Sequence, residues 1–446
     1  MTRGQIGLFG VGAAAAAALL ATCAASPIEV PAEAATASDS RRVMTFMYLW
    51  YGDEAGNYTH WNHAVLPHWR PIDGLAFKHA TGRRFAPPEE IHAPFWPRRG
   101  LYSSSDPVVL EEQMREMRAA GIGVAVVSWW GRPDVPGTHD SQGVNTDAVV
   151  PAVLAAAAKE NMRVAFHLEP YEGRTAASVV KDVEYIRNRY GAHRAVLRTT
   201  RAALGARPST PLEVPSDEGG VPLFFVYDSY HIPAEDWALH LNAGGALHRK
   251  GVFFGLVLRH QDQGDLARGA FDGLYSYFAT NGFSFGSTTT HWRGIATKAR
   301  EDGMVFSPSV APGYDDRRIR PWNLRAWRPR ASGGYYSSMW RAALAAVREG
   351  GFVTVTSWNE FGEGTQIEPC VPHTVKDGEG IPNSMRDALG EPGKRKSEDY
   401  GEAGPFHYLA VTRTFAIRLA APPSEQGGGG PPRGRAAPGG TVKEEL

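Results

Sequence analysis

The segment DPVVLEEQMREMRAAGIGVAVVSWW, residues 106–130, carries the pattern that decides the fold. Asp106 is a favourable helix N-cap, and Pro107 suits the first helical position. Apolar residues then recur at helical spacing, at Leu110, Met114 and Met117. Gly121 is a typical helix stop, and a continuous apolar run, Gly123–Trp129, follows at once. The segment therefore predicts a helix that leads into a strand buried on both faces.

The same alternation continues along the chain. Seven more short apolar runs resemble buried strands: Val43–Leu49, Arg163–His167, Leu223–Tyr227, Val252–Leu258, Gly273–Tyr277, Met304–Val310 and Phe352–Thr356. Helical patterns lie at residues 145–160, 175–190, 290–302 and 335–349. Eight strands that alternate with helices predict an α/β fold, a (β/α)₈ TIM barrel with long βα loops, in a single domain over residues 43–420. An open doubly wound sheet is the alternative, but no G-x-G-x-x-G follows the first run, so a dinucleotide site is unsupported.

Both ends of the chain differ from this domain. Residues 1–27 are nearly free of charge and Ala/Leu-rich, which is typical of a signal peptide or of an uncleaved N-terminal anchor. Residues 28–42 resemble a polar stem. Residues 421–446 are rich in Pro and Gly, which predicts a disordered tail. Its last four residues, KEEL, resemble the retrieval signal of the endoplasmic reticulum.

These ends predict a protein of the secretory-pathway lumen, in the Golgi or endoplasmic reticulum, either free or as a single-pass type II membrane protein. The tail would then bind a retrieval receptor. Asn57-Tyr58-Thr59 is a glycosylation sequon and agrees with this location. The only cysteines are Cys23 and Cys370, which excludes a disulfide framework. The formal net charge of zero gives no basis for nucleic-acid binding.

Aromatic, acidic and amide side chains follow nearly every predicted strand, where a barrel of this type places its active site. The last run leads into SWNEFGEG, which holds Glu360 and Glu363 three residues apart. Two carboxylates in one pocket can divide the work of glycoside cleavage, because repulsion and burial keep one of them protonated near neutral pH. If Asn359–Gly364 forms a turn, both carboxylates face the pocket.

Other chemistries lack their motifs. No zinc-type His/Cys spacing, no G-x-S-x-G elbow and no phosphate loop is present, so we expect neither metal nor cofactor. His60, His63 and His68 follow the first predicted strand. We expect them to form hydrogen bonds within the loop or to a sugar.

Long motifs make the chain resemble glycoside hydrolase family 99, the endo-α-1,2-mannosidases and endo-α-1,2-mannanases. The matching stretches span most of residues 43–420: WYG from Trp50, HAVLPHW from His63, SWWG from Ser128, HLEPY from His167, VYDSY from Val226, YFATNG from Tyr277, PGYDD from Pro312, RPWN from Arg320, NE at Asn359–Glu360 and EGTQIE from Glu363. The resemblance implies a (β/α)₈ barrel and retaining, endo-acting cleavage of α-mannosides, with release of glucosylated mannose from N-glycans.

The resemblance also implies unequal roles for the two glutamates. Glu360 would deprotonate the 2-hydroxyl of the sugar, which attacks the anomeric carbon to form a 1,2-anhydro intermediate, and Glu363 would protonate the leaving oxygen. Substrate contacts are expected from Tyr51, Trp129, His167, Glu169, Tyr171, Tyr227, Tyr275, Arg318 and Asn359. The family usually has Trp-His between the glutamates, whereas this chain has Phe361-Gly362. Two alternatives therefore stay open: a non-catalytic glycan-binding protein on the same fold, and a secreted α-mannan-degrading enzyme.

Overall fold

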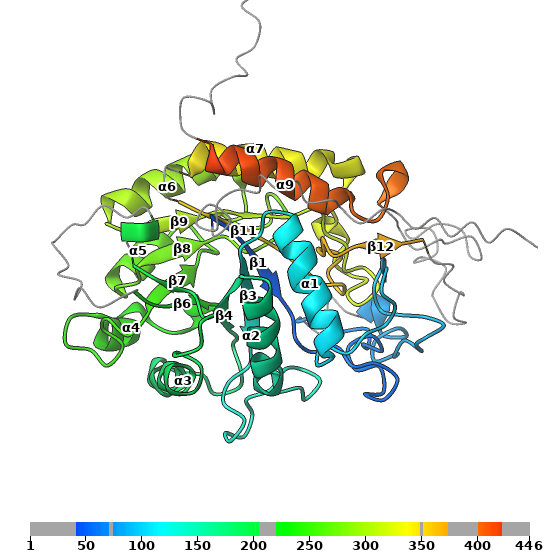
Figure 1. Cartoon of the computed structure of the whole chain (residues 1–446), viewed down its shortest axis with the longest axis horizontal. Helices are drawn as coiled ribbons and strands as arrows, with labels where there is room; N and C mark the ends of the chain where they lie inside the picture. Colours follow the sequence, from blue (N-terminus) through cyan, green and yellow to red (C-terminus); the bar gives the residue numbers. More distant parts are fainter. Residues whose placement is uncertain are drawn as a thin grey trace, which may run out of the picture. The chain divides into compact units, whose positions relative to one another are not determined.

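The apolar runs pair as parallel strands of one sheet (Figure 1). The computed structural model describes residues 42–70, 75–200, 202–204, 220–347, 351–372 and 400–421. The strand order is β10-β11-β1-β3-β4-β6-β7-β8-β9, and β5 pairs antiparallel with β6. The strands are β1 (Val43–Met47), β3 (Val124–Trp129), β4 (Arg163–Leu168), β5 (Arg198–Thr199), β6 (Val221–Val226), β7 (Val252–Leu256), β8 (Gly273–Tyr275), β9 (Val305–Ser307), β10 (Ser309–Val310) and β11 (Val353–Val355).

The two ends of this order meet at a single residue, Pro308. On one side of it β9 pairs with β8, and on the other β10 pairs with β11. Proline has no backbone N–H to donate to a ladder, so the strand is interrupted here. Its carbonyl still accepts from the Thr354 N–H at 3.1 Å. The run predicted as one strand thus joins both edges, and the sheet becomes a nearly closed barrel, as predicted; the open-sheet alternative is wrong.

Helices surround the strands and connect them (Figure 1). Five correspond to the predicted patterns: α1 (Pro107–Ala119), α2 (Val150–Lys159), α3 (Ala176–Arg189), α6 (Trp292–Glu301) and α7 (Gly334–Ala346). Asp106 caps α1 by accepting from the Val108 N–H at 2.8 Å. Among the helices of the described residues, three were not predicted: α4 (Ala234–Leu241), α5 (Asp262–Arg268) and α9 (His407–Ala420). The first two have only eight and seven residues, too few for a clear helical period.

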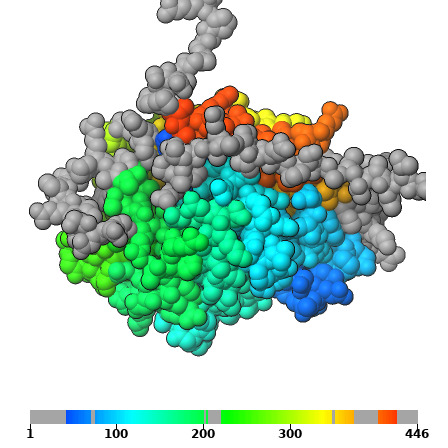
Figure 2. Space-filling model, viewed as in Figure 1, coloured from blue at the N-terminus to red at the C-terminus, as the bar shows by residue number. Residues whose placement is uncertain are grey.

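The interior of the barrel is filled by aromatic side chains. The Phe225 ring lies 5.6 Å from Phe46 and 5.5 Å from Phe254, and Phe254 lies 5.3 Å from Phe352. These side chains are at most 1 % exposed. From outside, the segments coloured cyan and green cover the strands on the face that Figure 2 shows. Because the barrel is packed rather than open, a ligand site has to form above the strand ends, among the loops.

Two short strands outside the barrel help to order those loops. β2 (Trp96–Pro97) precedes α1, and it pairs antiparallel with β12 (Cys370–Val371), which follows β11. The pairing ties the first βα loop to the last one. The leader, most of the stem and the tail with its KEEL ending lie outside the described residues. Among the helices that the structure describes, none has the length and apolar character required to cross a membrane.

Candidate active site

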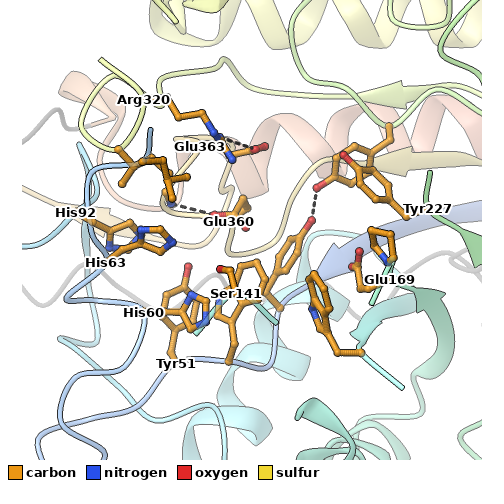
Figure 3. Close-up of a pocket in the computed structure, with 18 residues that line it drawn as sticks. Tyr51, His60, His63, His92, Ser141, Glu169, Tyr227, Arg320, Glu360 and Glu363 are labelled. Carbon is orange, nitrogen blue, oxygen red and sulfur yellow. Dashed lines mark hydrogen bonds and ion pairs between the residues drawn. The ribbon is translucent and has the colours of Figure 1, made fainter. Parts of the chain in front are cut away.

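A pocket lies at the C-terminal ends of the barrel strands (Figure 3). Its lining combines tyrosines, tryptophans, histidines and carboxylates from several βα loops. The lining residues are Tyr48, Trp50, Tyr51, His60, His63, Leu66, His92, Trp130, Ser141, Glu169, Pro170, Tyr227, Tyr277, Ile319, Arg320, Glu360, Gly362 and Glu363. The loop after β1 supplies seven of them, and the turn after β11 supplies both predicted catalytic carboxylates.

The predicted turn after β11 brings Glu360 and Glu363 to the same pocket. The Phe361 N–H donates to the Asn359 carbonyl at 3.0 Å, and the Gly364 N–H donates to the Phe361 carbonyl at 3.1 Å. Gly364 has φ +60°, and a Cβ there would lie 2.9 Å from the Asp315 carbonyl oxygen. Only glycine fits this position without strain. The tight turn places two carboxylates three residues apart on one wall.

The two carboxylates have different partners. Glu360 Oε1 accepts from the Gly362 N–H at 3.1 Å, whereas Glu363 Oε1 accepts from Arg320 at 3.1 Å. Burial raises the pKa of Glu360 well above its usual value, and the charge of Glu363 adds to this. Burial also raises the pKa of Glu363, while the Arg320 guanidinium opposes the rise. The pair therefore retains a shared proton at higher pH than exposed glutamates do.

Two neutral histidines form the wall beside Glu360 (Figure 3). Nδ1 of His63 donates to the Ala64 carbonyl at 2.7 Å, and Nδ1 of His92 donates to the Trp61 carbonyl at 3.2 Å. Burial lowers the pKa of His63 to about 4 and lowers that of His92 well below its usual value. With the proton on Nδ1 of each ring, both Nε2 atoms are hydrogen-bond acceptors.

The opposite side of the pocket presents Glu169 and Tyr227 (Figure 3). His167 lies behind Glu169: its Nδ1 is 2.9 Å from the Glu169 carboxylate and its Nε2 is 2.8 Å from the Tyr275 hydroxyl. These two hydrogen bonds hold the Glu169 carboxylate in one orientation toward the pocket. The hydroxyls of Tyr48 and Tyr277 are hydrogen-bonded to each other in the same lining.

Another buried carboxylate, Glu368, supports the turn after β11 from behind. It is 0 % exposed, and it accepts from Arg99 at 2.7 Å, Tyr102 at 2.8 Å and Gln113 at 2.9 Å. The Tyr102 hydroxyl in turn accepts from the Asn359 amide at 3.1 Å. Hydrogen bonds thus run without a break from Arg99 to the residue that precedes Glu360.

Five of the predicted site residues line the pocket: Tyr51, Glu169, Tyr227, Glu360 and Glu363. The other six do not. Besides His167 and Tyr275, described above, they are Trp129, Tyr171, Arg318 and Asn359. Asn359 uses its amide on the backbone of Tyr48, at 2.8 and 2.9 Å, so it holds β1 and the turn together.

The remaining three lie outside the pocket lining and have other partners, and their contact with substrate stays a prediction. Trp129 points outward from β3 because side chains alternate along a strand, and its indole N–H donates to Asp147 at 2.8 Å. Tyr171 donates to Asp182. Arg318 pairs with Glu90 at 3.0 Å, and Arg320 occupies the pocket instead.

Several lining residues were not predicted. Tyr48, Trp50, Trp130 and Tyr277 all stand at strand ends, so the rule that locates barrel sites could have found them. His92 and Ser141 lie deep in long loops, where nothing in the sequence marks them.

Comparison with known proteins agrees with this geometry. Residues 39–383 match the family model described as Glycosyl hydrolase family 99. A glycoprotein endo-alpha-1,2-mannosidase-like protein of Danio rerio is 38 % identical over 379 residues, 83 % of this chain and 76 % of the relative. The chain belongs to glycosyl hydrolase family 99.

Further relatives support the membership of this family 99 chain. A glycoprotein endo-alpha-1,2-mannosidase of Rattus norvegicus is 39 % identical over 385 residues, 85 % of this chain and 75 % of the relative. The solved structure of the GH99 endo-alpha-mannosidase from Bacteroides thetaiotaomicron is 32 % identical, with a TM-score of 0.69, and the match covers 85 % of this chain and 97 % of that one. The protein is a glycoside hydrolase with a TIM-barrel fold.

In this family 99 chain, the Phe361-Gly362 dipeptide places a buried ring and a glycine between the two glutamates. Phe361 is fully buried, and its ring packs 5.2 Å from Trp61 and 6.0 Å from Tyr51. Gly362 lines the pocket beside His92, and a Cβ there would lie 3.1 Å from the His92 ring and 3.2 Å from Glu360 Oε1. The absence of a side chain at 362 lets the backbone lie close to both His92 and Glu360.

Proposed function

We propose that the protein is a retaining, endo-acting hydrolase that cleaves internal α-1,2-mannosidic linkages of N-glycans and releases glucosylated mannose. One observation carries the proposal: Glu360 and Glu363 face one pocket with different partners, the Gly362 N–H for Glu360 and the Arg320 guanidinium for Glu363. The relatives named glycoprotein endo-alpha-1,2-mannosidase support the substrate class.

The first step uses the substrate's own oxygen as nucleophile. Glu360 takes the proton of the 2-hydroxyl, O2 attacks C1, and the bond from C1 to the leaving oxygen breaks. Glu363 gives its proton to that oxygen. The products are a 1,2-anhydro sugar and the shortened glycan. The attacking oxygen is already part of the molecule, which gives it a high effective molarity.

The second step reverses these proton transfers. Glu363, now a carboxylate, takes a proton from water as the water oxygen attacks C1. The C1–O2 bond breaks, and Glu360 returns its proton to O2. Two inversions at C1 leave the configuration unchanged. Each glutamate ends in the protonation state in which it began.

The mechanism needs the shared proton on Glu363. Substrate binding favours this arrangement. A 2-hydroxyl that donates to Glu360 stabilises the carboxylate form, and a glycosidic oxygen that accepts from Glu363 stabilises the acid form. Arg320, which contacts Glu363, then holds the carboxylate that remains after the proton has been transferred.

The neutral histidines fit a substrate rich in hydroxyl groups. Nε2 of His63 and of His92 can each accept from a sugar hydroxyl, and neither ring adds a positive charge that would pull the proton from the glutamate pair. We assign to them the orientation of the sugar beside Glu360.

We assign the activity to the lumen of the secretory pathway, and the substrate class supports this assignment. The leader at residues 1–27 and the KEEL ending support this location, with a retrieval receptor as the partner of the tail. Tagging the chain between the leader and the stem, with and without KEEL, tests it: removal of KEEL should shift the protein from cells to medium. Equal retention of both forms would contradict the role of the tail.

Product analysis on a glucosylated high-mannose glycan tests the activity. We expect an oligosaccharide product, formed first as the α-anomer in a time-resolved NMR spectrum, and no free mannose. Glu360→Gln and Glu363→Gln should both abolish it. Turnover of yeast-type α-mannan without turnover of the N-glycan would instead select the α-mannan-degrading enzyme, and glycan binding without turnover would contradict catalysis.

A further inference from the structure

Three rings lie beside the pocket, of which that of Trp69 is exposed and those of His68 and Trp322 are half-buried. Trp69 is 67 % exposed, and its ring meets that of Trp322 edge-on at 4.3 Å. The His68 ring packs against Trp322 at 4.5 Å. We call His68, Trp69 and Trp322 the aromatic corner. Large aromatic side chains are usually buried, and when they gather at the surface they commonly mark a binding site.

One hydrogen bond joins the aromatic corner to the pocket wall, and a second one holds that part of the wall together. The indole N–H of Trp322 donates to the Leu66 carbonyl at 3.1 Å. The Leu66 N–H donates to the Ile319 carbonyl at 2.7 Å. Leu66 and Ile319 both line the pocket. The aromatic corner therefore continues the wall of the pocket outward.

The corner adjoins one particular end of the pocket. Arg320 lies between Ile319 and Trp322 in the chain, and it binds Glu363 at 3.1 Å. Figure 3 shows Arg320 and Glu363 together, on the side away from Glu169. If Glu363 protonates the leaving oxygen, this end of the pocket faces the part of the glycan that leaves.

We propose that the aromatic corner binds the sugar units on the leaving-group side of the cleaved linkage. The exposed indole face of Trp69 can stack on the C–H face of a pyranose ring, and Trp322 holds the Trp69 ring in place. The ligand class is a pyranose oligosaccharide, because the corner is continuous with a pocket lined by tyrosines, tryptophans, histidines and carboxylates, which are side chains suited to binding sugars. The assignment of the side rests on the proposed roles of Glu360 and Glu363; the assignment of the ligand does not.

Two substrates with the same sugar on the cleaved side separate the corner from the pocket. One carries several sugar units on the leaving side, and the other carries only an aryl group there. Trp69→Ala should lower the ratio of kcat/KM for the long substrate to that for the short one about three- to tenfold, as expected for one lost ring contact. Trp322→Phe, which keeps a ring but removes the N–H, should lower it less. Leu239→Ala, in α4 and 71 % exposed, is the control and should leave the ratio unchanged.

Calorimetry with the leaving-side oligosaccharide alone gives a second measurement that needs no turnover. The Kd should rise by a similar factor in Trp69→Ala and stay constant in Leu239→Ala. An unchanged ratio together with an unchanged Kd would overturn the proposal. If the wild-type protein turned over neither substrate, the proposed function would fail, while the calorimetric comparison would still decide whether the corner binds the oligosaccharide.

Discussion

Glu360 and Glu368 lie eight residues apart on the segment after β11, yet their surroundings are opposite. Glu360 faces a pocket, its carboxylate accepts from the backbone N–H of Gly362, and it has another carboxylate as neighbour. Glu368 is enclosed and accepts from Arg99, Tyr102 and Gln113. The same residue type is left reactive in one place and fully satisfied in the other.

The two carboxylates differ in what their surroundings allow them to do. A poorly satisfied buried carboxylate has a raised pKa and can exchange protons, whereas an ion-paired one with three donors serves to hold its neighbours. Substitutions near Glu360, at the pocket end of this segment, should therefore change the catalytic rate and its pH dependence. Substitutions near Glu368, at its buried end, should change the free energy of unfolding.

The largest effect is expected at the pocket end, for Glu363→Gln. Loss of the group that protonates the leaving oxygen should lower kcat on a natural glycan by about 10³-fold. A substrate with an activated leaving group needs little protonation, so much of its rate should return. The comparison of initial rates on the two substrates checks this. An equal loss on both would argue against the assignment of Glu363 as the acid.

At the buried end, Glu368→Gln should lower the free energy of unfolding by about 3 kcal/mol, because the carboxylate that pairs with buried Arg99 is removed. Urea unfolding measures this. The kcat per folded molecule should stay within about fivefold of wild type, since Glu368 does not line the pocket. A change in kcat as large as that of Glu363→Gln, with unchanged stability, would break the distinction between the two ends.

Arg320→Met tests the electrostatics of the pair. Removal of the guanidinium disfavours both carboxylates, so the pKa of Glu360 and that of Glu363 should rise. The pair then gains its second proton, and loses its last, at higher pH. The whole kcat/KM profile should move to higher pH. Arg317→Met is the control, because Arg317 pairs with Asp315 outside the pocket lining and should leave the profile in place.

The smallest effect is expected from Gly362→Ala. A Cβ at 362 lies 3.1 Å from the His92 ring, so the ring has to move by a few tenths of an ångström. We expect a rise in KM of about threefold and a stability loss of about 1 kcal/mol. Gly294→Ala, in α6 with no atom within 4 Å of the added Cβ, should instead stabilise the protein by about 0.5–1 kcal/mol. Equal behaviour of the two variants in thermal unfolding would contradict the close approach of Gly362 to His92.

Local patterns in the sequence determined the barrel. Each of the eight apolar runs became a strand or, around Pro308, a pair of short strands, because burial on both faces requires a continuous apolar run whatever its neighbours are. The position of Glu360 and Glu363 was likewise readable, since it follows from the end of the last strand and a short turn. Their unequal roles came from the family resemblance, and they remain a prediction.

Only the tertiary structure decided which side chains reach the pocket. Trp129 and Trp130 are adjacent in the sequence, but Trp129 contacts Asp147 whereas Trp130 lines the pocket. Arg318 and Arg320 are two residues apart, but Arg318 pairs with Glu90 whereas Arg320 lines the pocket. His92 approaches Glu360 from a loop more than 260 residues away in the chain. Loop conformations depend on long-range contacts such as the Ala64–Arg84 bridge and the pairing of β2 with β12, and no local pattern encodes these contacts.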